Sequence, residues 1–134
     1  MAWRGQNDGG GAAAILVGAV QAVCTVTIPA GAQTLWAEVA ITSDSESANL
    51  DAFEVQYRPH ASGGFHTVAD AAADFQTAFP WPVLWASDDL TTASDGSDYA
   101  IALNVRAVDA VRFNAAMSGA TSSDVEILIS WQIR

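Results

Sequence analysis

Two histidines are the first candidates for chemistry in this sequence. His60 lies near the start of a stretch, Pro59 to Gly64, that has the composition of a turn, and His66 lies just after this stretch. They could approach each other across a hairpin, but no third ligand is evident, and a zinc site needs three or four converging donors. We interpret them as loop and strand-end histidines, and the sequence predicts no metal site and no cofactor.

A second candidate is the acidic run from Asp88 to Asp98, which contains Gly96. Oxygen-rich loops with a glycine bind calcium in many proteins. The EF-hand pattern, however, needs ligands at alternate positions and a closing glutamate, and this run has neither. A surface loop is the favoured interpretation, and the same holds for Asp44 and Glu46.

No nucleophile stands in a recognisable catalytic setting. Cys24 is the single cysteine, so no disulfide can form within the chain, and its place in an alternating apolar run indicates a buried side chain. Serines are plentiful, but Gly-x-Ser-x-Gly does not occur, and neither does a phosphate-binding glycine motif. We expect a protein that is not an enzyme, since an enzyme on this chain has no positive support.

Tryptophans supply the remaining candidates. Trp81 lies between two prolines and Trp85 follows shortly after, which makes this the most distinctive local segment. Exposed tryptophans anchor protein partners or stack on sugar rings, whereas buried ones cap a core. Trp3 and Arg4 stand near the start of a glycine-rich stretch, where a tryptophan is useful only if it docks. The candidate partner contacts are therefore Trp3, Arg4, Trp81 and Trp85.

The charge balance excludes several partners. The 134 residues include fifteen acidic residues and five basic ones, all of them arginine, which gives a net charge of −10. Binding to a phosphate backbone needs clustered positive charge, so we predict no nucleic-acid binding. An anionic membrane surface would repel the chain for the same reason. The acidity suits a soluble protein displayed in many copies.

The N-terminus has two interpretations. The apolar run from Ala12 to Cys24 has some features of a signal peptide. Asp8 and the glycines that follow it do not suit the basic start of such a peptide. We therefore expect residues 1–11 to form a flexible arm and residues 12–134 to form one β-sandwich domain.

Alternation of apolar and polar residues predicts an all-β fold. In Leu35–Thr42 and Phe53–Arg58 every second residue is apolar, which is typical of half-buried strands. Phe65–Val68 completes a hairpin with Phe53–Arg58, and Phe79–Trp85 suits an edge strand or a docked extended segment because of its prolines. Further strands are expected at Val23–Ile28, Tyr99–Val105, Val108–Met117 and Val125–Gln132. About eight short strands predict an antiparallel β-sandwich, jelly-roll-like.

The order of these segments resembles a known class of protein. Val-Thr-Ile-Pro-Ala-Gly-Ala begins at Val26, Asp-Ala-Phe-Glu-Val-Gln-Tyr-Arg begins at Asp51, and Gly-Gly-Phe-His-Thr-Val begins at Gly63. Val-Asp-Ala-Val-Arg-Phe-Asn-Ala-Ala and a terminal strand follow. The layout from Thr25 to the end is similar to small β-sandwich virion proteins of tailed bacteriophages, in particular capsid decoration (cement) proteins.

This resemblance implies a non-enzymatic structural protein on the capsid surface of a virion. Its partner would be the major capsid protein, whose shell it would stabilise, and it would form a homo-oligomer, with a trimer favoured. The segment with Trp3 and Arg4 would suit a tether to the shell. A head–tail or tail component and a carbohydrate-binding module are the alternatives, the latter because of Trp81 and Trp85.

Overall fold

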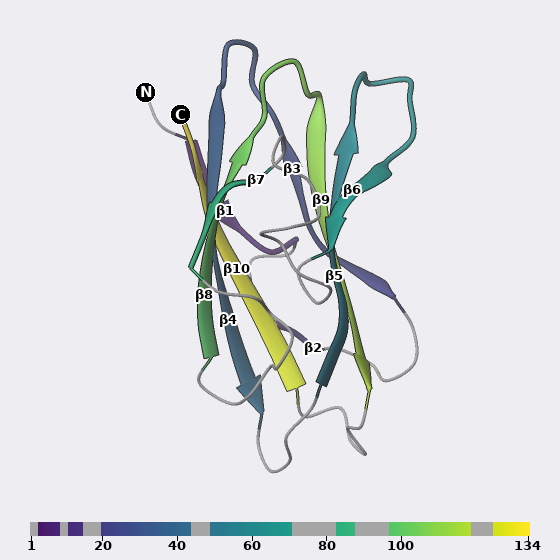
Figure 1. Ribbon diagram of the computed structural model, residues 1–134, viewed down its shortest axis with the longest axis vertical. Coiled ribbons are helices and arrows are strands. Elements are labelled where there is room, and N and C mark those ends of the chain that lie inside the picture. The colour runs from purple at the N-terminus through teal and green to yellow at the C-terminus, as the bar shows by residue number, and fades with distance from the viewer. Residues whose placement is uncertain are drawn as a thin grey trace.

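The alternating runs form the strands of two facing sheets in the computed structural model (Figure 1). The structure describes residues 3–8, 11–14, 20–43, 49–70, 83–87, 97–118 and 125–134. Within these ranges the strands are β1 (Trp3–Gln6), β2 (Ala13–Ala14), β3 (Gln21–Thr27), β4 (Thr34–Ser43), β5 (Asn49–Arg58), β6 (His66–Asp70), β7 (Val83–Ala86), β8 (Ser97–Asn104), β9 (Ala110–Ser118) and β10 (Val125–Ile133).

All strand pairings in the described residues are antiparallel. One sheet has six strands in the order β1-β10-β4-β8-β7, with β2 also paired to β10, and the other has four in the order β3-β9-β5-β6. The predicted antiparallel β-sandwich is therefore confirmed. The finer jelly-roll-like description stays a prediction.

The core lies between the two sheets and follows from the period of two. On β4, Leu35, Ala37 and Val39 are buried while Trp36 and Glu38 are exposed, as the alternation predicts. The four-stranded sheet contributes apolar residues in the same way. The largest side chains with almost no exposure are Phe53, Phe113, Leu35, Ile101, Leu103, Ile127, Ile129 and Ile133.

The predicted hairpin is confirmed, since β5 pairs with β6 across the turn that follows Arg58. The proline-rich segment also contains an edge strand, because β7 lies at the border of the six-stranded sheet and pairs only with β8 among the described strands. Its first part, residues 79–82, lies outside the described residues. Trp85 lies within β7, and Trp81 is one of the residues not described.

The N-terminal segment differs from the prediction of a flexible arm. Trp3–Gln6 forms β1, which pairs with the end of β10 from Ile133 to Ser130. The physical reason is that β10 has a free edge there, whose backbone groups gain hydrogen-bond partners when a strand is added. The prediction of a free arm over residues 1–11 is thus corrected for the residues that form β1.

Asn7 holds this segment in place. Its carboxamide Nδ2 donates to the backbone oxygens of Ile127 (2.7 Å) and Gly11 (3.1 Å), and its Oδ1 accepts from the backbone N–H of Ile129 (2.7 Å). The side chain is only 3% exposed. It therefore replaces a strand residue on the edge of β10, between the stretches that pair with β1 and β2.

The next residue joins the N-terminal segment to the other sheet. The backbone N–H of Asp8 donates to the oxygen of Val23 (3.3 Å), and the Asp8 carboxylate accepts from the N–H of Thr25 (3.0 Å). The thiol of Cys24 donates to the oxygen of Gln6 (3.6 Å). The segment thus links β10 of one sheet with β3 of the other.

We expect Asn7→Ala to lower the free energy of unfolding by about 2–4 kcal/mol, because it leaves a buried N–H and a buried carbonyl of β10 without a partner. Urea unfolding would measure the change. Gln6→Ala is the matched control, since Gln6 is exposed and makes one long bond, to Ser130 at 3.5 Å. Equal stabilities of the two variants would contradict this role of Asn7.

Candidate binding surfaces

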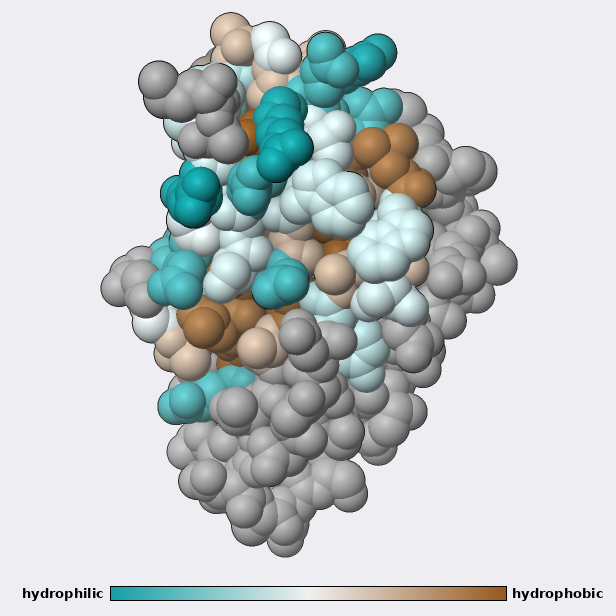
Figure 2. Space-filling view, turned by 90° about the vertical axis from the view of Figure 1, so that its left-hand side faces the viewer, coloured by the Kyte–Doolittle hydropathy of each residue, from teal (hydrophilic) through white to brown (hydrophobic). Residues whose placement is uncertain are grey.

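The outer face of the six-stranded sheet carries a row of side chains that is unusual for a solvated surface. Arg4, Gln132, Trp36, Ala102 and Trp85 are neighbours in register across β1, β10, β4, β8 and β7. All of them except the buried Ala102 line, together with Glu38 on β4, an open depression of about 920 Å³. Figure 2 views the molecule from the side of this sheet. We call this surface the tryptophan face.

Two rings dominate the tryptophan face. The centroids of Trp36 and Trp85 are 5.7 Å apart and their planes are inclined by 41°. Ala102 lies between them in register and is almost completely buried, so its small side chain lets the two rings approach across β8. Trp36 is nevertheless 45% exposed and Trp85 48% exposed. Large aromatic surface is thus held at fixed geometry in contact with solvent.

The charged groups of the tryptophan face are available for binding. The side chains of Arg4 and Glu38 have no hydrogen bond or ion pair to any residue that the structure describes. The other four arginines have partners: Arg58 binds Asp109, Arg106 binds Gln33, Arg112 binds Gln56, and Arg134 binds Gln132 when that amide turns its oxygen toward the guanidinium. Arg134 also lines the depression, and Arg4 is the arginine there whose side chain has no partner among the described residues.

The outer face of the four-stranded sheet is different, because its polar groups bind one another. Thr67 donates to Glu54 (2.9 Å) and accepts from Gln56 (3.1 Å), and Gln56 accepts from Arg112 (2.9 Å). The guanidinium of Arg112 lies 4.1 Å from the ring centroid of Phe65, a cation–π contact. Since these groups are already satisfied, this face has less to gain from a ligand than the tryptophan face.

A third surface lies at one end of the sandwich, the upper end in Figure 1. Three turns meet there: residues 28–33 between β3 and β4, residues 59–65 between β5 and β6, and residues 105–109 between β8 and β9. They border a shallow hollow of about 370 Å³. We call this surface the turn end.

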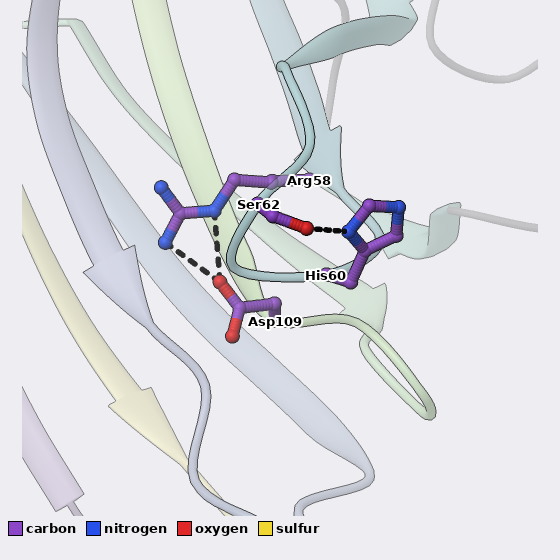
Figure 3. A network of polar contacts seen from close by, with 4 residues as sticks. All are labelled: Arg58, His60, Ser62 and Asp109. Carbon is purple, nitrogen blue, oxygen red and sulfur yellow. Dashed lines mark hydrogen bonds and ion pairs between the residues drawn. The ribbon is translucent and has the colours of Figure 1, made fainter.

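Asp109 ties the three turns together. Its carboxylate binds the guanidinium of Arg58, with Oδ2 at 2.6 Å from Nη2 and 2.8 Å from Nε (Figure 3). Its backbone oxygen accepts from the N–H of Ile28 (2.9 Å), and its N–H donates to the oxygen of Arg58 (2.9 Å). His60 bonds Ser62 within the second turn (3.0 Å). The turn end therefore has a fixed shape.

The turn end carries one charge without an oppositely charged partner, that of the exposed Arg106, whose guanidinium binds the neutral side chain of Gln33. Of the fifteen acidic residues only Asp109 belongs to its three turns, and it is neutralised by Arg58. The exposed side chains include Pro59, Ala30 and Ala61, which are small and apolar.

The predicted contact residues divide between these surfaces. Arg4 and Trp85 come from opposite edges of the sheet and both line the depression of the tryptophan face. Trp3 alternates with Arg4 along β1, lies outside that lining and is 42% exposed. Trp81 lies outside the described residues. Sequence reasoning missed Trp36 as a site residue, although the alternation of its strand predicts that it faces away from Leu35.

The histidines do not form a metal centre with neighbours that the structure describes. In those parts of the chain, no three of the His, Cys, Asp and Glu side chains come close enough together to hold a metal ion. His60 lies in the hairpin turn and His66 begins β6. No helix within the described ranges has the length and apolar character needed to cross a membrane.

Cys24 has the properties of a core residue, as predicted. The side chain is fully buried, and burial together with the nearby negative charge of Asp8 raises the pKa of its thiol from 9.0 to about 12. Burial also raises the pKa of Tyr57, whose hydroxyl donates to the backbone oxygen of Asn104. A thiol that stays protonated is a poor nucleophile.

Comparisons with known proteins found no relative of this chain. No protein-family model matches the sequence, and neither a curated protein nor a solved structure shows significant similarity to the chain.

One backbone position at the turn end is strained. Ala107 has a φ of 59°, in the left-handed region that favours glycine. We expect Ala107→Gly to raise the free energy of unfolding by about 0.5–1 kcal/mol, because the relief of strain exceeds the entropy cost of glycine. Ala61→Gly, at an exposed position without a positive φ, should lower it. Thermal unfolding of the two variants measures the change in stability. If both lost the same amount of stability, the claim that the backbone at Ala107 is strained would be contradicted.

The pKa of Cys24 predicts a loss of stability in alkali. Below pH 9 the thiol is protonated in both states, and above pH 9 it ionises in the unfolded chain but stays protonated in the folded one up to about pH 12. The free energy of unfolding should therefore fall by about 1.4 kcal/mol between pH 8 and pH 10. Urea unfolding of wild type and Cys24→Ala tests this, because the variant should lack that share of the decrease. Identical pH slopes would refute it.

Proposed function

We propose that this chain is a non-enzymatic structural protein of a virion, of the capsid decoration (cement) type, which binds the major capsid protein and stabilises its shell. The sequence layout that resembles such proteins motivates the proposal. The observation that carries it is the turn end, a fixed surface on a strongly acidic protein that carries no unpaired carboxylate in its three turns and one free positive charge, that of Arg106. The site of action would be the outer surface of the capsid.

A charge that is removed from water at an interface costs free energy unless it finds a partner. The centres of protein–protein interfaces are depleted in charged residues, because a desolvated charge without a partner is costly. A chain with fifteen acidic residues carries many such charges. The turn end carries Asp109, already paired with Arg58, one further charge on Arg106, which binds Gln33, and small apolar side chains around them. Because its only carboxylate is already neutralised, contact with another protein leaves no acidic group of these turns unpaired.

Preorganisation supports the same function. A decoration protein adds stability to a shell only if its own contact surface loses little entropy on binding. Backbone bonds join the three turns to one another, among them Val105 N–H to the oxygen of Gln33 (3.0 Å) and Ile28 N–H to the oxygen of Asp109 (2.9 Å). The acidic remainder of the protein would face outward, where like charge keeps particles apart.

Decoration proteins act as symmetric sets around capsid axes, and we expect a homo-oligomer, with a trimer favoured. A head–tail or tail component is a variant of this proposal in which the same surface meets a different virion protein. Light scattering of the purified chain measures its mass in solution and thereby tests the trimer separately from capsid binding.

Co-sedimentation tests the proposal. Full-length chain should pellet with shells assembled from the major capsid protein of the genome that encodes it. Ala61→Asp places a charge on the turn end and should weaken binding by about tenfold or more. Val20→Asp adds the same charge at an exposed position before β3, outside the turn end, and should bind as wild type does. A wild-type chain that stays in the supernatant would overturn the proposed function, and equal losses for the two variants would overturn the role of the turn end.

A further inference from the structure

The tryptophan face is not needed for docking through the turn end, and it has its own chemistry. We propose that it binds a neutral oligosaccharide, with Trp36 and Trp85 as stacking platforms and Arg4 and Glu38 as hydrogen-bonding groups. This inference goes beyond the proposed function and does not depend on it, because different residues carry the two.

The exposed indole rings of Trp36 and Trp85 provide surfaces on which sugar rings can pack. Sugar rings present faces of C–H groups, which pack well on the flat, electron-rich face of an indole. Trp36 and Trp85 leave nearly half of their surface in contact with solvent at a fixed centroid distance of 5.7 Å. Because Ala102 is small and buried between them, this geometry exists before any ligand arrives. Two indole rings whose spacing is fixed before binding suit a ligand with repeated rings, each of which can pack on one indole.

The polar side chains beside the rings provide hydrogen-bond donors and acceptors for sugar hydroxyls. A sugar hydroxyl donates one hydrogen bond and accepts others, so its site needs groups of both kinds. Arg4 offers only donors and Glu38 only acceptors, and neither has a partner among the described residues. Ser130 and Gln132 lie between them on β10 and also line the depression. A purely apolar protein partner would leave these charges desolvated without compensation.

The shape of the depression and the charge of the protein favour a linear and neutral chain of sugars. The lining crosses the sheet from β1 to β7, which at strand spacings of about 4.8 Å is roughly 19 Å, and the depression is open to solvent. An open, elongated surface suits a linear chain of sugars better than one small molecule. The protein's net charge of −10 disfavours polyanionic glycans, so we infer a neutral chain.

Tryptophan fluorescence titration and calorimetry test the proposal. The probes are soluble neutral hexasaccharides of glucose, mannose, galactose and N-acetylglucosamine, added to the full chain. We expect at least one of them to bind, Trp36→Ala and Trp85→Ala each to weaken that binding by about tenfold or more, and Arg4→Gln and Glu38→Gln to weaken it less. Trp3→Ala is the matched control, since Trp3 is similarly exposed but does not line the depression.

Several results would overturn it. Absence of binding to every hexasaccharide would do so, and so would binding that Trp36→Ala and Trp85→Ala leave unchanged while their circular dichroism shows an intact fold. If these two variants instead lost capsid co-sedimentation and no sugar bound, the tryptophan face would be a protein-docking surface. Sugar binding by a chain that ignores capsids would sustain this inference and refute only the proposed function.

Discussion

The hydrogen bonds between Asn7 and β10 constrain much of the remaining structure, because they fix the register of β1. Side chains alternate along a strand, so a slip by one residue would exchange its two faces. In the observed register Arg4 pairs with Gln132 and reaches the outer face, while Gly5 pairs with Trp131 on the opposite side. One buried carboxamide thus decides whether the tryptophan face contains its free cation.

The same register explains a glycine within a strand. A Cβ on Gly5 would lie 2.6 Å from Cζ2 of Trp131, so the indole can pack against β1 only because that atom is missing. Trp131 Nε1 is buried and lacks a hydrogen-bond partner among the described residues, which costs stability. At the edge formed by β1 and β10, the unpaired Nε1 of Trp131 destabilises the fold, whereas the hydrogen bonds of Asn7 stabilise it. Burial of the apolar surface of the indole also favours this arrangement.

The sequence predicts local features of this fold better than relations between strands. Alternation alone assigns Leu35 to the core and Trp36 to the surface, because the period of two does not depend on neighbours. The pairing of Trp36 with Trp85 depends on the order β4-β8-β7, which many sequences with the same alternation would not share. Asn7 gave no signal, since one polar residue beside glycines is equally compatible with a free arm. For that reason Trp3, Arg4 and Trp85 could be proposed as contacts, but not the surface that Arg4 and Trp85 form together.

The distribution of arginines connects the two surfaces. With five cations against fifteen acidic groups, each arginine used within the fold is one fewer for partners. Arg58 neutralises Asp109, which lets the turn end be fixed without an unpaired carboxylate. Arg112 is held by Gln56 and Phe65, which leaves the outer face of the four-stranded sheet saturated. Because Arg4 arrives on a strand held by Asn7 and meets no acidic partner in the described structure, its donors stay available, and the tryptophan face keeps the mixed polarity that a hydroxyl-rich ligand requires.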